Sequence, residues 1–432
     1  MDSYNDTINW LFTQLPMFQS LGAGAYKPGL DTARTLASAF GNPHSKFKTI
    51  HVGGTNGKGS TSHSLAAVLM KAGYKVGLYT SPHLFAFRER IRVNGEKITK
   101  EAVMDFVQRY RAKELGCEPS FFELATIMAF DYFTKEAVDV AVIEVGLCGK
   151  LDTTNIISPI LSIITNVSLD HVALLGDTEV AIAGEKAGII KPHTPVVIGE
   201  SEGEVRKVFA NKAKLENSPI IFADDKPLPY HSDGDALAYE ACINGENLCL
   251  KSDLTGDCQH KNMATIVAAI NALHGVLDIP INAISEGLAD VQGLTGLMGR
   301  WMTLRACSPT IVCDTGHNIG AWQYLAPTLQ EIAAKKHLHL VLGFANDKDV
   351  YAIFALLPKN AEYYFVTPQV KRAKPSAELL QLGASNGLKG EACDTVTTGC
   401  EKALADSSDE DFIFIGGSNF VVAEIPATIA RL

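Results

Sequence analysis

The chain of 432 residues lacks several features that would assign it to a specialised class of protein. It has no apolar run long enough to span a bilayer, and its first residues, Met1–Asp6, are polar and acidic, unlike a signal or transit peptide. Positive charge is scarce, because 38 Lys and Arg residues stand against 48 Asp and Glu residues and leave a net charge of −10. Binding to a nucleic-acid backbone needs a basic surface. We therefore expect a cytoplasmic protein without a membrane or nucleic-acid partner.

The nine cysteines lack the arrangement of a disulfide framework or a zinc site. Their number is odd, they are scattered between Cys117 and Cys400, and no Cys-x-x-Cys pair occurs. The hydrophobic fraction of 47% and the charged fraction of 20% are ordinary for a globular protein. The chain is too long for one ordinary core, so we expect more than one domain.

Short apolar runs alternate with helical patterns, which predicts a mostly parallel sheet covered by helices on both faces. The runs that follow Ile50–Val52 are Val76–Tyr79, Val138–Val145, Leu161–Val167 and Pro195–Ile198. Two further runs flank Asn244-Gly245, a hairpin signal, and we expect this ribbon to border the main sheet. The helical pattern of residues 260–277 follows it.

Glycines at 293, 296 and 299 indicate a domain boundary, after which the alternation of strands and helices restarts. The runs beyond it are Thr310–Cys313, His339–Gly343, Tyr363–Thr367 and Phe412–Ile415. We therefore predict an α/β protein with a first domain at residues 1–295 and a second, smaller one at residues 296–432.

The most informative segment runs from Ile50 to Ser60 and reads as a strand, a glycine-rich turn and the start of a helix. The predicted helix begins near Ser60 and stops at Gly73. Glycines let a backbone approach phosphate closely, Lys58 adds positive charge, and the Ser60 hydroxyl can bind Mg²⁺. The spacing departs from the common P-loop, because Gly59 separates Lys58 from the hydroxyl. Nucleotide binding is the favoured interpretation, and a tight turn with an exposed lysine is the alternative.

Polar residues also stand where other predicted strands end, the edge at which open α/β sheets place their ligands. They are Ser81, Glu144 and the pair Asp170-His171. With Ser60 they would supply oxygen ligands for Mg²⁺, although histidine suits transition metals better. Taken singly, each is better interpreted as a turn or cap residue, and only the convergence of all four favours a metal site.

Lys186 lies in the dense segment Gly184–Ile190, where small neighbours allow close backbone approach. A lysine near metal ions would be repelled unless it were modified to an anion. From composition alone, a surface lysine on a helix is the favoured interpretation.

Asp314–Asn318 follows the first strand of the second domain, and Arg300 lies just after the boundary. These residues fit a second grip on a nucleotide, and they fit equally a turn with a capping asparagine.

Arg88, Arg90 and Arg92 alternate, so a strand there would place all three on one face. That face fits a polyanionic ligand or, more commonly, a solvated hairpin. Phe121 and Phe122 fit either ring stacking or core packing, and core packing is the default.

Five motifs in order resemble the bacterial folylpolyglutamate synthase/dihydrofolate synthase branch of the Mur ligase superfamily. They are His51–Ser60, Tyr79–Leu84, Glu144–Leu147, Leu169–His171 and Glu185–Ile189. The resemblance extends from Tyr26–Leu30 to Gly416–Ser418. It implies a P-loop-containing, mostly parallel sheet domain, a smaller Rossmann-like domain, and MgATP bound in a cleft between domains that close on it.

The implied reaction is ATP-dependent amide-bond formation, in which a substrate carboxylate becomes an acyl phosphate and the amino group of L-glutamate displaces phosphate. The implied substrates are dihydropteroate and reduced folates, and the implied state is a monomer. The implied catalytic residues are Lys58, Lys186 and His171. The implied ATP contacts are Gly54, Thr55, Asn56, Gly57, Lys58, Gly59, Ser60, Asn262, Arg300, Asp314 and His317.

By the same resemblance, Ser60 and Ser81 bind one Mg²⁺, whereas Glu144 and His171 bind a second. Lys186 matches a carbamylated lysine, which would turn the cation into a metal ligand. Pro82, Phe122 and Thr153 match substrate-binding positions, with Phe122 stacking on the pterin.

Four residues depart from the family pattern: Cys148 and Lys150 replace a glycine and an arginine, and Met298 and Ile319 replace prolines. One rival interpretation is a cell-wall Mur ligase, which should carry an additional domain before the glycine-rich turn. The other is a non-enzymatic nucleotide-binding protein, which has no use for Glu144, His171 and Lys186 together.

Overall fold

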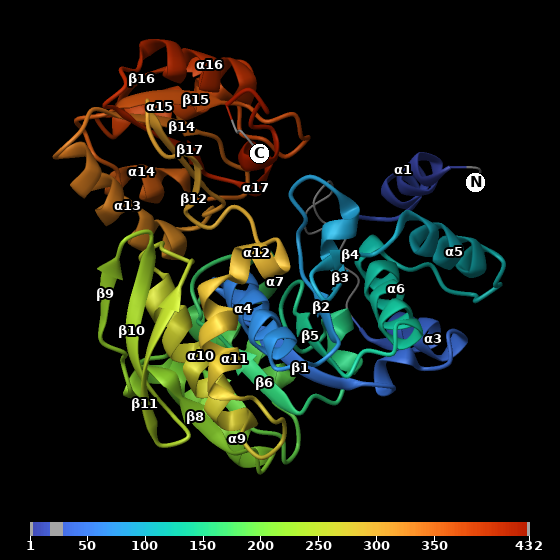
Figure 1. Ribbon diagram of the computed structural model, residues 1–432. Coiled ribbons are helices and arrows are strands. Elements are labelled where there is room, and N and C mark those ends of the chain that lie inside the picture. The colour runs from blue at the N-terminus through green and yellow to red at the C-terminus, as the bar shows by residue number, and fades with distance from the viewer. Residues whose placement is uncertain (1–2, 18–28, 430–432) are drawn as a thin grey trace. The chain divides into compact units, whose positions relative to one another are not determined.

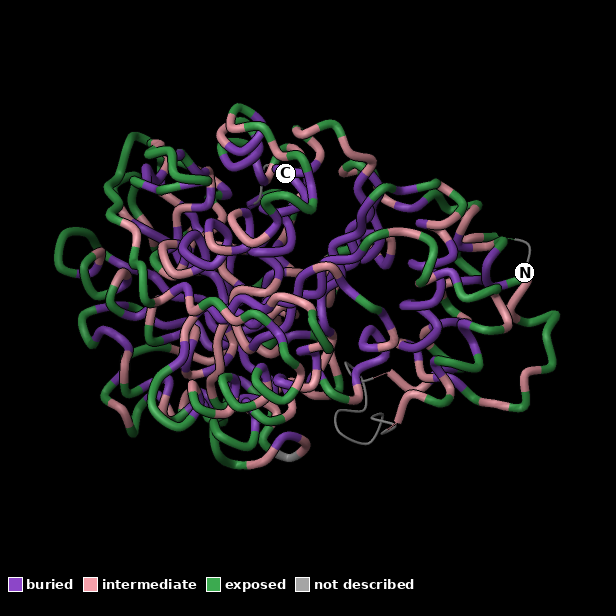
Figure 2. The backbone as a smooth tube through the Cα atoms, turned by 90° about the horizontal axis from the view of Figure 1, so that it is seen from below, coloured by how far each residue is buried: buried purple, intermediate pink, exposed green. Residues whose placement is uncertain are grey.

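The structure is a computed structural model in which residues 3–17 and 29–429 are described. Tyr26–Pro28, at the start of the family resemblance, lie outside the described residues. Contacts divide the chain into two compact units. The first contains residues up to 168 with 172–255 and 259–297, and the second contains 169–171, 256–258 and 298 onward. The buried residues, purple in Figure 2, form the interiors of these units.

An eight-stranded sheet forms the centre of the first unit, in the order β4-β3-β2-β5-β1-β6-β7-β8 (Figure 1). From β2 to β8 neighbouring strands are parallel, and β3 and β4 add an antiparallel edge. The strands are β1 Lys48–Gly53, β2 Val76–Tyr79, β3 Ile91–Val93, β4 Glu96–Lys97, β5 Val140–Glu144, β6 Leu161–Ile164, β7 Val196–Ile198 and β8 Ile220–Phe222. The predicted mostly parallel sheet is therefore confirmed.

Successive residues of the central strands pack into different cores, as the period of two along a strand requires. In β5, Val140 and Val142 pack with α4, α10 and α11, whereas Ala141 and Ile143 pack with α1, α3, α5 and α6. The remaining helices of this unit are α7, α8, α9 and α12. Their bounds are α1 Tyr4–Gln14, α3 Asp31–Ala39, α4 Lys58–Lys71, α5 Lys100–Arg111, α6 Phe121–Lys135, α7 Val172–Leu175, α8 Glu179–Lys186, α9 Gly203–Leu215, α10 Gln259–Leu273, α11 Ile281–Ala289 and α12 Val291–Thr295.

The hairpin predicted at Asn244-Gly245 is present, but the ribbon does not border the main sheet. It forms a separate three-stranded sheet in the order β11-β10-β9, with Ile243 opposite Glu246. The strands are β9 Tyr230–Asp233, β10 Ala236–Ile243 and β11 Glu246–Ser252. The inward residues of this small sheet, such as Tyr239 and Leu250, pack in the same core as α10 and α11. Their apolar side chains are therefore buried without pairing of the ribbon to the main sheet.

The strand expected through the three arginines is wrong. Phe87–Arg90 is a 3-10 helix, and only Ile91–Val93 is a strand. Arg90 and Arg92 are 3% and 5% exposed, so the row of arginines forms neither a binding surface nor a solvated face.

The second unit contains a six-stranded sheet in the order β12-β13-β17-β14-β15-β16, parallel except at β12. Leu340 and Phe365 share a core with α13, α14 and α15, whereas Val341 and Val366 lie on the opposite face, against Gly399 of α16. The strands are β12 Met302–Arg305, β13 Thr310–Asp314, β14 Leu338–Leu342, β15 Glu362–Val366, β16 Lys389–Cys393 and β17 Phe412–Gly416. The helices are α13 Ile319–Ala333, α14 Val350–Leu356, α15 Ser376–Ser385, α16 Val396–Asp406 and α17 Asn419–Ala423. Within the described segments, no helix is long and apolar enough to cross a membrane.

Candidate active site

The glycine-rich turn between β1 and α4 holds its backbone in conformations that side chains rarely adopt. Gly54 has a φ of +134°, and a Cβ there would lie 1.9 Å from Thr165 Oγ1. Gly57 has a φ of +83°, and its Cβ would lie 2.2 Å from Asn262 Oδ1. Both positions therefore require glycine, for conformation and for space.

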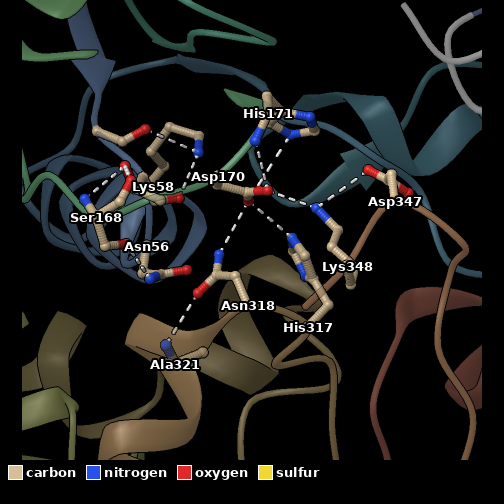
Figure 3. A network of polar contacts seen from close by, with 12 residues as sticks. Asn56, Lys58, Ser168, Asp170, His171, His317, Asn318, Ala321, Asp347 and Lys348 are labelled. Atoms are coloured by element: carbon tan, nitrogen blue, oxygen red, sulfur yellow. Dashed lines mark hydrogen bonds and ion pairs between the residues drawn. The ribbon is translucent and has the colours of Figure 1, made fainter. Parts of the chain in front are cut away.

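A lysine ammonium group and a helix N-terminus come together where this turn enters α4. The helix begins at Lys58, two residues before the predicted start, and its N-cap residue Gly57 makes no side-chain capping bond. The backbone N–H groups of the first turn carry the positive end of the helix dipole. Lys58 Nζ folds over the turn and donates to the carbonyl oxygens of Gly54, at 3.1 Å, and Thr55, at 2.9 Å (Figure 3). A phosphate group suits such a site.

The turn is tied to the segment that follows β6. The backbone N–H of Asn56 donates to Asn166 Oδ1 at 2.9 Å, and the Asn56 side chain donates to Ser168 Oγ at 3.3 Å. The backbone N–H of Thr55 donates to the Asn166 carbonyl at 3.0 Å. Asn56 and Thr55 therefore shape the turn through their partners.

A buried amide network lies against Ser60, and one of its members was not predicted from the sequence. Gln259 Nε2 donates to Ser60 Oγ at 3.3 Å, and Asn262 Nδ2 donates to Gln259 Oε1 at 2.8 Å. Both amides lie on α10, three residues apart. The helical spacing of Gln259 and Asn262 was visible in the sequence, but the contact between α10 and α4 was not.

Ser81 and Glu144 lie at the carboxyl ends of the neighbouring parallel strands β2 and β5, as the sequence predicts. The Ser81 backbone N–H donates to Glu144 Oε2 at 3.3 Å, and the Glu144 side chain is buried. The first unit therefore brings the Ser81 backbone and the Glu144 carboxylate together.

Lys186 is the last residue of α8 and is 4% exposed, so the surface lysine favoured from composition is wrong. Its Nζ donates to the Gly54 carbonyl at 2.8 Å. Glycine permits the close packing around it, since a Cβ on Gly149 would lie 2.9 Å from Lys186 Cα.

The predicted substrate-binding residues occupy three segments of the first unit. Phe122 is the second residue of α6 and packs against the backbone of Gly146, where a Cβ would lie 2.3 Å from Phe122 Cζ. Its neighbour Phe121 is buried in the core, as the default interpretation holds. Pro82 is exposed, and Thr153 is buried at the start of a short 3-10 helix.

Asp170 is the centre of an ion-pair network in the second unit (Figure 3). Its carboxylate accepts a hydrogen bond from Asn318 Nδ2 at 3.0 Å and one from Lys348 Nζ, and its Oδ2 lies 3.3 Å from His317 Nε2. Burial opposes ionisation, but His317, His171 and Lys348 hold the pKa of Asp170 well below its usual value. His171 Nε2 lies 3.8 Å from the same carboxylate. His171 and His317 therefore share one acidic partner.

Arg300 and Asp314 each form hydrogen bonds with residues next to the other in the sequence. The Asp314 carboxylate accepts from the N–H groups of Trp301 and Gly316, each at 2.7 Å, and Arg300 donates to Thr315 Oγ1. Burial raises the pKa of Asp314, against the lowering effect of Arg300. Asn318 caps α13 by accepting from the Ala321 N–H at 2.9 Å, so the capping alternative is also correct for that residue.

Three or more His, Cys, Asp or Glu side chains do not gather into a metal site anywhere in the described part of the chain. A metal held by the predicted residues would depend on hydroxyl oxygens and on its nucleotide as well as on Glu144.

Two family models match the chain: the Mur ligase middle domain over residues 52–271 and the Mur ligase glutamate ligase domain over residues 299–419. The chain is 34% identical to the probable bifunctional folylpolyglutamate synthase/dihydropteroate synthase of Haloferax volcanii, with 99% of this chain and 51% of that protein aligned. It is 30% identical to the dihydrofolate synthase/folylpolyglutamate synthase of Escherichia coli, with 97% and 95% aligned. The chain thus spans about half the length of the Haloferax relative and nearly all of the Escherichia coli one.

Solved structures give the same grouping. Escherichia coli FolC in complex with DHPP and ADP superposes with a TM-score of 0.84 at 28% identity, covering 98% of this chain and 96% of that one. The bifunctional folylpolyglutamate synthase/dihydrofolate synthase of Yersinia pestis, complexed with AMPPNP and Mn ion, gives 0.82 at 26% identity, covering 100% and 99%. The predicted α/β fold class and family resemblance are confirmed, and the chain belongs to the dihydrofolate synthase/folylpolyglutamate synthase family of the Mur ligase superfamily.

Proposed function

We propose that this protein is an ATP-dependent amide ligase that adds L-glutamate to dihydropteroate and to reduced folates. The observation that carries the proposal is the first unit's strand–turn–helix, where the N-terminus of α4 and the Lys58 ammonium converge on the turn. Membership of the family, with relatives named for both synthase activities, supports the choice of substrates.

The phosphates of ATP fit the turn because its groups are held before the ligand arrives. Gly54 and Gly57 leave the backbone accessible, and Lys58 places a cation over it. Hydrogen-bond donors fixed in advance stabilise the charge that develops in phosphoryl transfer without reorganisation. Gly59 and Ser60, in the first turn of α4, complete the cradle that we propose.

The residues around the turn also fit Mg²⁺, which prefers oxygen ligands. The Ser60 and Ser81 hydroxyl groups are the oxygen donors that we propose hold a first ion, and the Glu144 carboxylate is the oxygen donor that we propose for a second. Bound Mg²⁺ would neutralise phosphate charge and polarise the reacting γ-phosphate. The relative bound to AMPPNP and Mn ion supports a divalent metal with a nucleotide.

A second Mg²⁺ and a carbamate on Lys186 are further parts of the proposal. As an ammonium, Lys186 donates to Gly54 and would repel a cation, whereas a carbamate would offer oxygen atoms. His171 is the other proposed ligand of the second ion, beside Glu144.

The residues of the second unit that we propose contact ATP are Arg300, Asp314 and His317, and Asn262 is their counterpart on α10 of the first unit. Arg300 and His317 bring donors, and Asp314 brings an acceptor for a ribose hydroxyl or an amino group. For the acid substrate, we propose that Phe122 offers an aromatic face on which the pterin stacks. Pro82 and Thr153 are the other proposed substrate contacts.

The proposed reaction has two steps. A carboxylate oxygen of the acid attacks the γ-phosphorus of ATP, the bond to the β-phosphate oxygen breaks, and ADP leaves. The nitrogen of L-glutamate then attacks the carbonyl carbon of the acyl phosphate, loses a proton, and inorganic phosphate departs. Positioning and electrostatic stabilisation carry most of the rate enhancement of such transfers.

Product analysis tests the proposal. Dihydropteroate and tetrahydrofolate are offered separately with ATP, Mg²⁺ and L-glutamate, and mass spectrometry follows each acid. We expect each to gain one or more glutamate residues. Gain by one acid alone would restrict the activity to one synthase, and turnover only with a nucleotide-linked muramyl acid would assign the protein to cell-wall synthesis instead.

A further inference from the structure

The loop between β2 and β3 is a closed structure of its own. The Thr80 backbone N–H donates to the Arg90 carbonyl at 3.0 Å, which joins the two ends of the loop. Residues 81–86 form no helix or strand, and the 3-10 helix Phe87–Arg90 completes the loop. Compact loops whose ends meet and whose own side chains fill them are frequently functional.

The Glu89 side chain accepts hydrogen bonds from the backbone of this loop. Its Oε2 accepts from the N–H groups of Leu84, at 2.9 Å, and Phe85, at 3.3 Å, and its Oε1 accepts from Ala86 at 2.9 Å. Glu89 is 8% exposed, and Lys97 Nζ lies 3.8 Å from Oε1. One buried carboxylate therefore fixes three consecutive residues, with charge-assisted hydrogen bonds that are stronger than neutral ones.

Arg90 forms a hydrogen bond with His83, the residue before Leu84–Ala86. Its Nε donates to His83 Nδ1 at 2.7 Å, and its guanidinium lies 5.2 Å from the centre of the Phe121 ring. A guanidinium can only donate, so His83 Nδ1 is the acceptor of this hydrogen bond. Burying a charge is costly unless it is well bonded, and here Arg90 bonds to the loop.

One end of this loop contacts a residue of the candidate site. Ser81, at the start of the loop, donates its N–H to Glu144 Oε2. Pro82 and Phe85 have apolar side chains, and both residues are exposed, Phe85 by 46%. A large aromatic side chain held at the surface by a fixed backbone offers a flat apolar face.

We propose that Glu89 and Arg90 are positioning residues that hold residues 81–86 in the conformation that receives the aromatic part of the carboxylic acid substrate, with Phe85 as a contact. The inference rests on the proposed function, because Pro82 in this loop is one of the proposed substrate contacts. A loop ordered in advance loses less conformational freedom when the ligand binds.

Three variants test the scaffold. Glu89→Gln keeps the shape of the side chain but replaces one acceptor oxygen by a donor, so it cannot accept at both ends. Arg90→Lys keeps the charge and loses the planar donor that meets His83. Glu96→Gln is the matched control, because it removes a carboxylate from the adjoining strand β4, where Glu96 is exposed. Hydrogen exchange of the amides of Leu84–Ala86, thermal unfolding and steady-state kinetics are measured for each.

We expect exchange of at least one of those amides to accelerate by about tenfold in Glu89→Gln, since the nitrogen that replaces one acceptor oxygen cannot accept. The KM for dihydropteroate should rise by about tenfold in both loop variants. The KM for ATP should stay within about twofold, because Glu89 bonds to residues 84–86, whereas Ser81, the proposed Mg²⁺ ligand, bonds to Glu144. Phe85→Ala should raise the KM for dihydropteroate without changing exchange at Leu84 or Ala86. Glu96→Gln should match the wild type in all measurements.

Unchanged protection in Glu89→Gln would refute the scaffold. Faster exchange with an unchanged KM for dihydropteroate would refute its role toward the acid. If Glu89→Gln fails to fold, the Arg90→Lys kinetics decide by the same criterion. A wild-type protein that couples no pterin-bearing acid would overturn the proposed function and the substrate role together, whereas hydrogen exchange would still decide the scaffold.

Discussion

Lys186 donates a hydrogen bond from its ammonium group to the carbonyl oxygen of Gly54, across 2.8 Å. The lysine closes α8, and the glycine opens the turn after β1, 132 positions earlier in the chain. The contact is buried, since Lys186 is 4% exposed. It ties α8 to the turn that we propose binds phosphate, so the lysine and the turn should act together.

Lys186→Ala is therefore expected to lose at least about a hundredfold in turnover, the scale of removing a transition-state contact from a polar site. If a carbamate forms, added bicarbonate should raise wild-type activity after carbon dioxide is stripped and should have no effect on Lys186→Ala. Lys207→Ala, on the exposed surface of α9, is the control. A fully active Lys186→Ala would contradict both the contact and the carbamate.

Lys58→Ala should abolish ATP turnover and leave the fold intact, because the ammonium lies over the turn at the start of α4 and is partly exposed. Circular dichroism and the rate of ADP release measure the two effects. Lys71→Ala removes a lysine from the last turn of the same helix, where it pairs with Glu286 at 3.8 Å, and should leave turnover unchanged. Near-normal turnover of Lys58→Ala would exclude the phosphate role.

Gly57→Ala tests whether the turn needs its space as well as its conformation. Alanine at φ +83° costs about 1–2 kcal/mol in the backbone, and its Cβ meets Asn262 Oδ1. Gly73→Ala has a similar φ of +90° but open space around it, so it shares only the backbone cost. Both variants should lose stability, and only Gly57→Ala should raise the KM for ATP, by about tenfold or more. Equal kinetics in the two would show that the contact with Asn262 does not matter.

His51, at the centre of β1, should make stability depend on pH. Burial, with a smaller effect of Lys191, lowers its pKa to about 3 from the ordinary 6.5. Between those values the unfolded chain binds a proton that the native protein does not, so the free energy of unfolding falls as the pH falls, by up to about 1.4 kcal/mol per pH unit. His51→Gln should flatten this slope in urea unfolding between pH 7 and 4, and His231→Gln, on exposed β9, should not. An unchanged slope in His51→Gln would place the acid sensitivity elsewhere.

The sequence predicts those parts of the fold that depend on neighbouring residues. The strand, glycine turn and helix around Lys58 are a local pattern, and so is the hairpin at Asn244-Gly245, whose turn needs φ above zero. The order in which the strands pair is not local. Because the main core extends beneath Tyr239 and Leu250, the ribbon became a sheet of its own.

The error at Arg88–Arg92 has a different cause. The three arginines do stand at every second position, but Glu89 bonds to the preceding backbone N–H groups and Arg90 bonds to His83, and the segment is a 3-10 helix in place of a strand. The partners that bury Arg90, such as Phe121, are distant in the sequence. Burial of Lys186 and the contact of Gln259 with Ser60 were hidden for the same reason.

Two of the four departures from the family pattern stand at positions where the family's residue has a local structural reason. Cys148 replaces a glycine at a φ of +66°, the left-handed region that glycine adopts without cost. Ile319 is the first residue of α13, the position where proline is favoured in helices. Neither departure alters the strand ends that carry the candidate site, so the family resemblance holds despite them.

The most direct test of the account is the dependence of ADP release on both partners of the proposed reaction. Purified protein is given MgATP with dihydropteroate, with L-glutamate, with both and with neither, and ADP and the pterin product are measured together. We predict rapid ADP release only with both, and one new amide bond for each ADP formed. ADP released at the same rate without L-glutamate, or without any glutamylated pterin, would contradict this prediction.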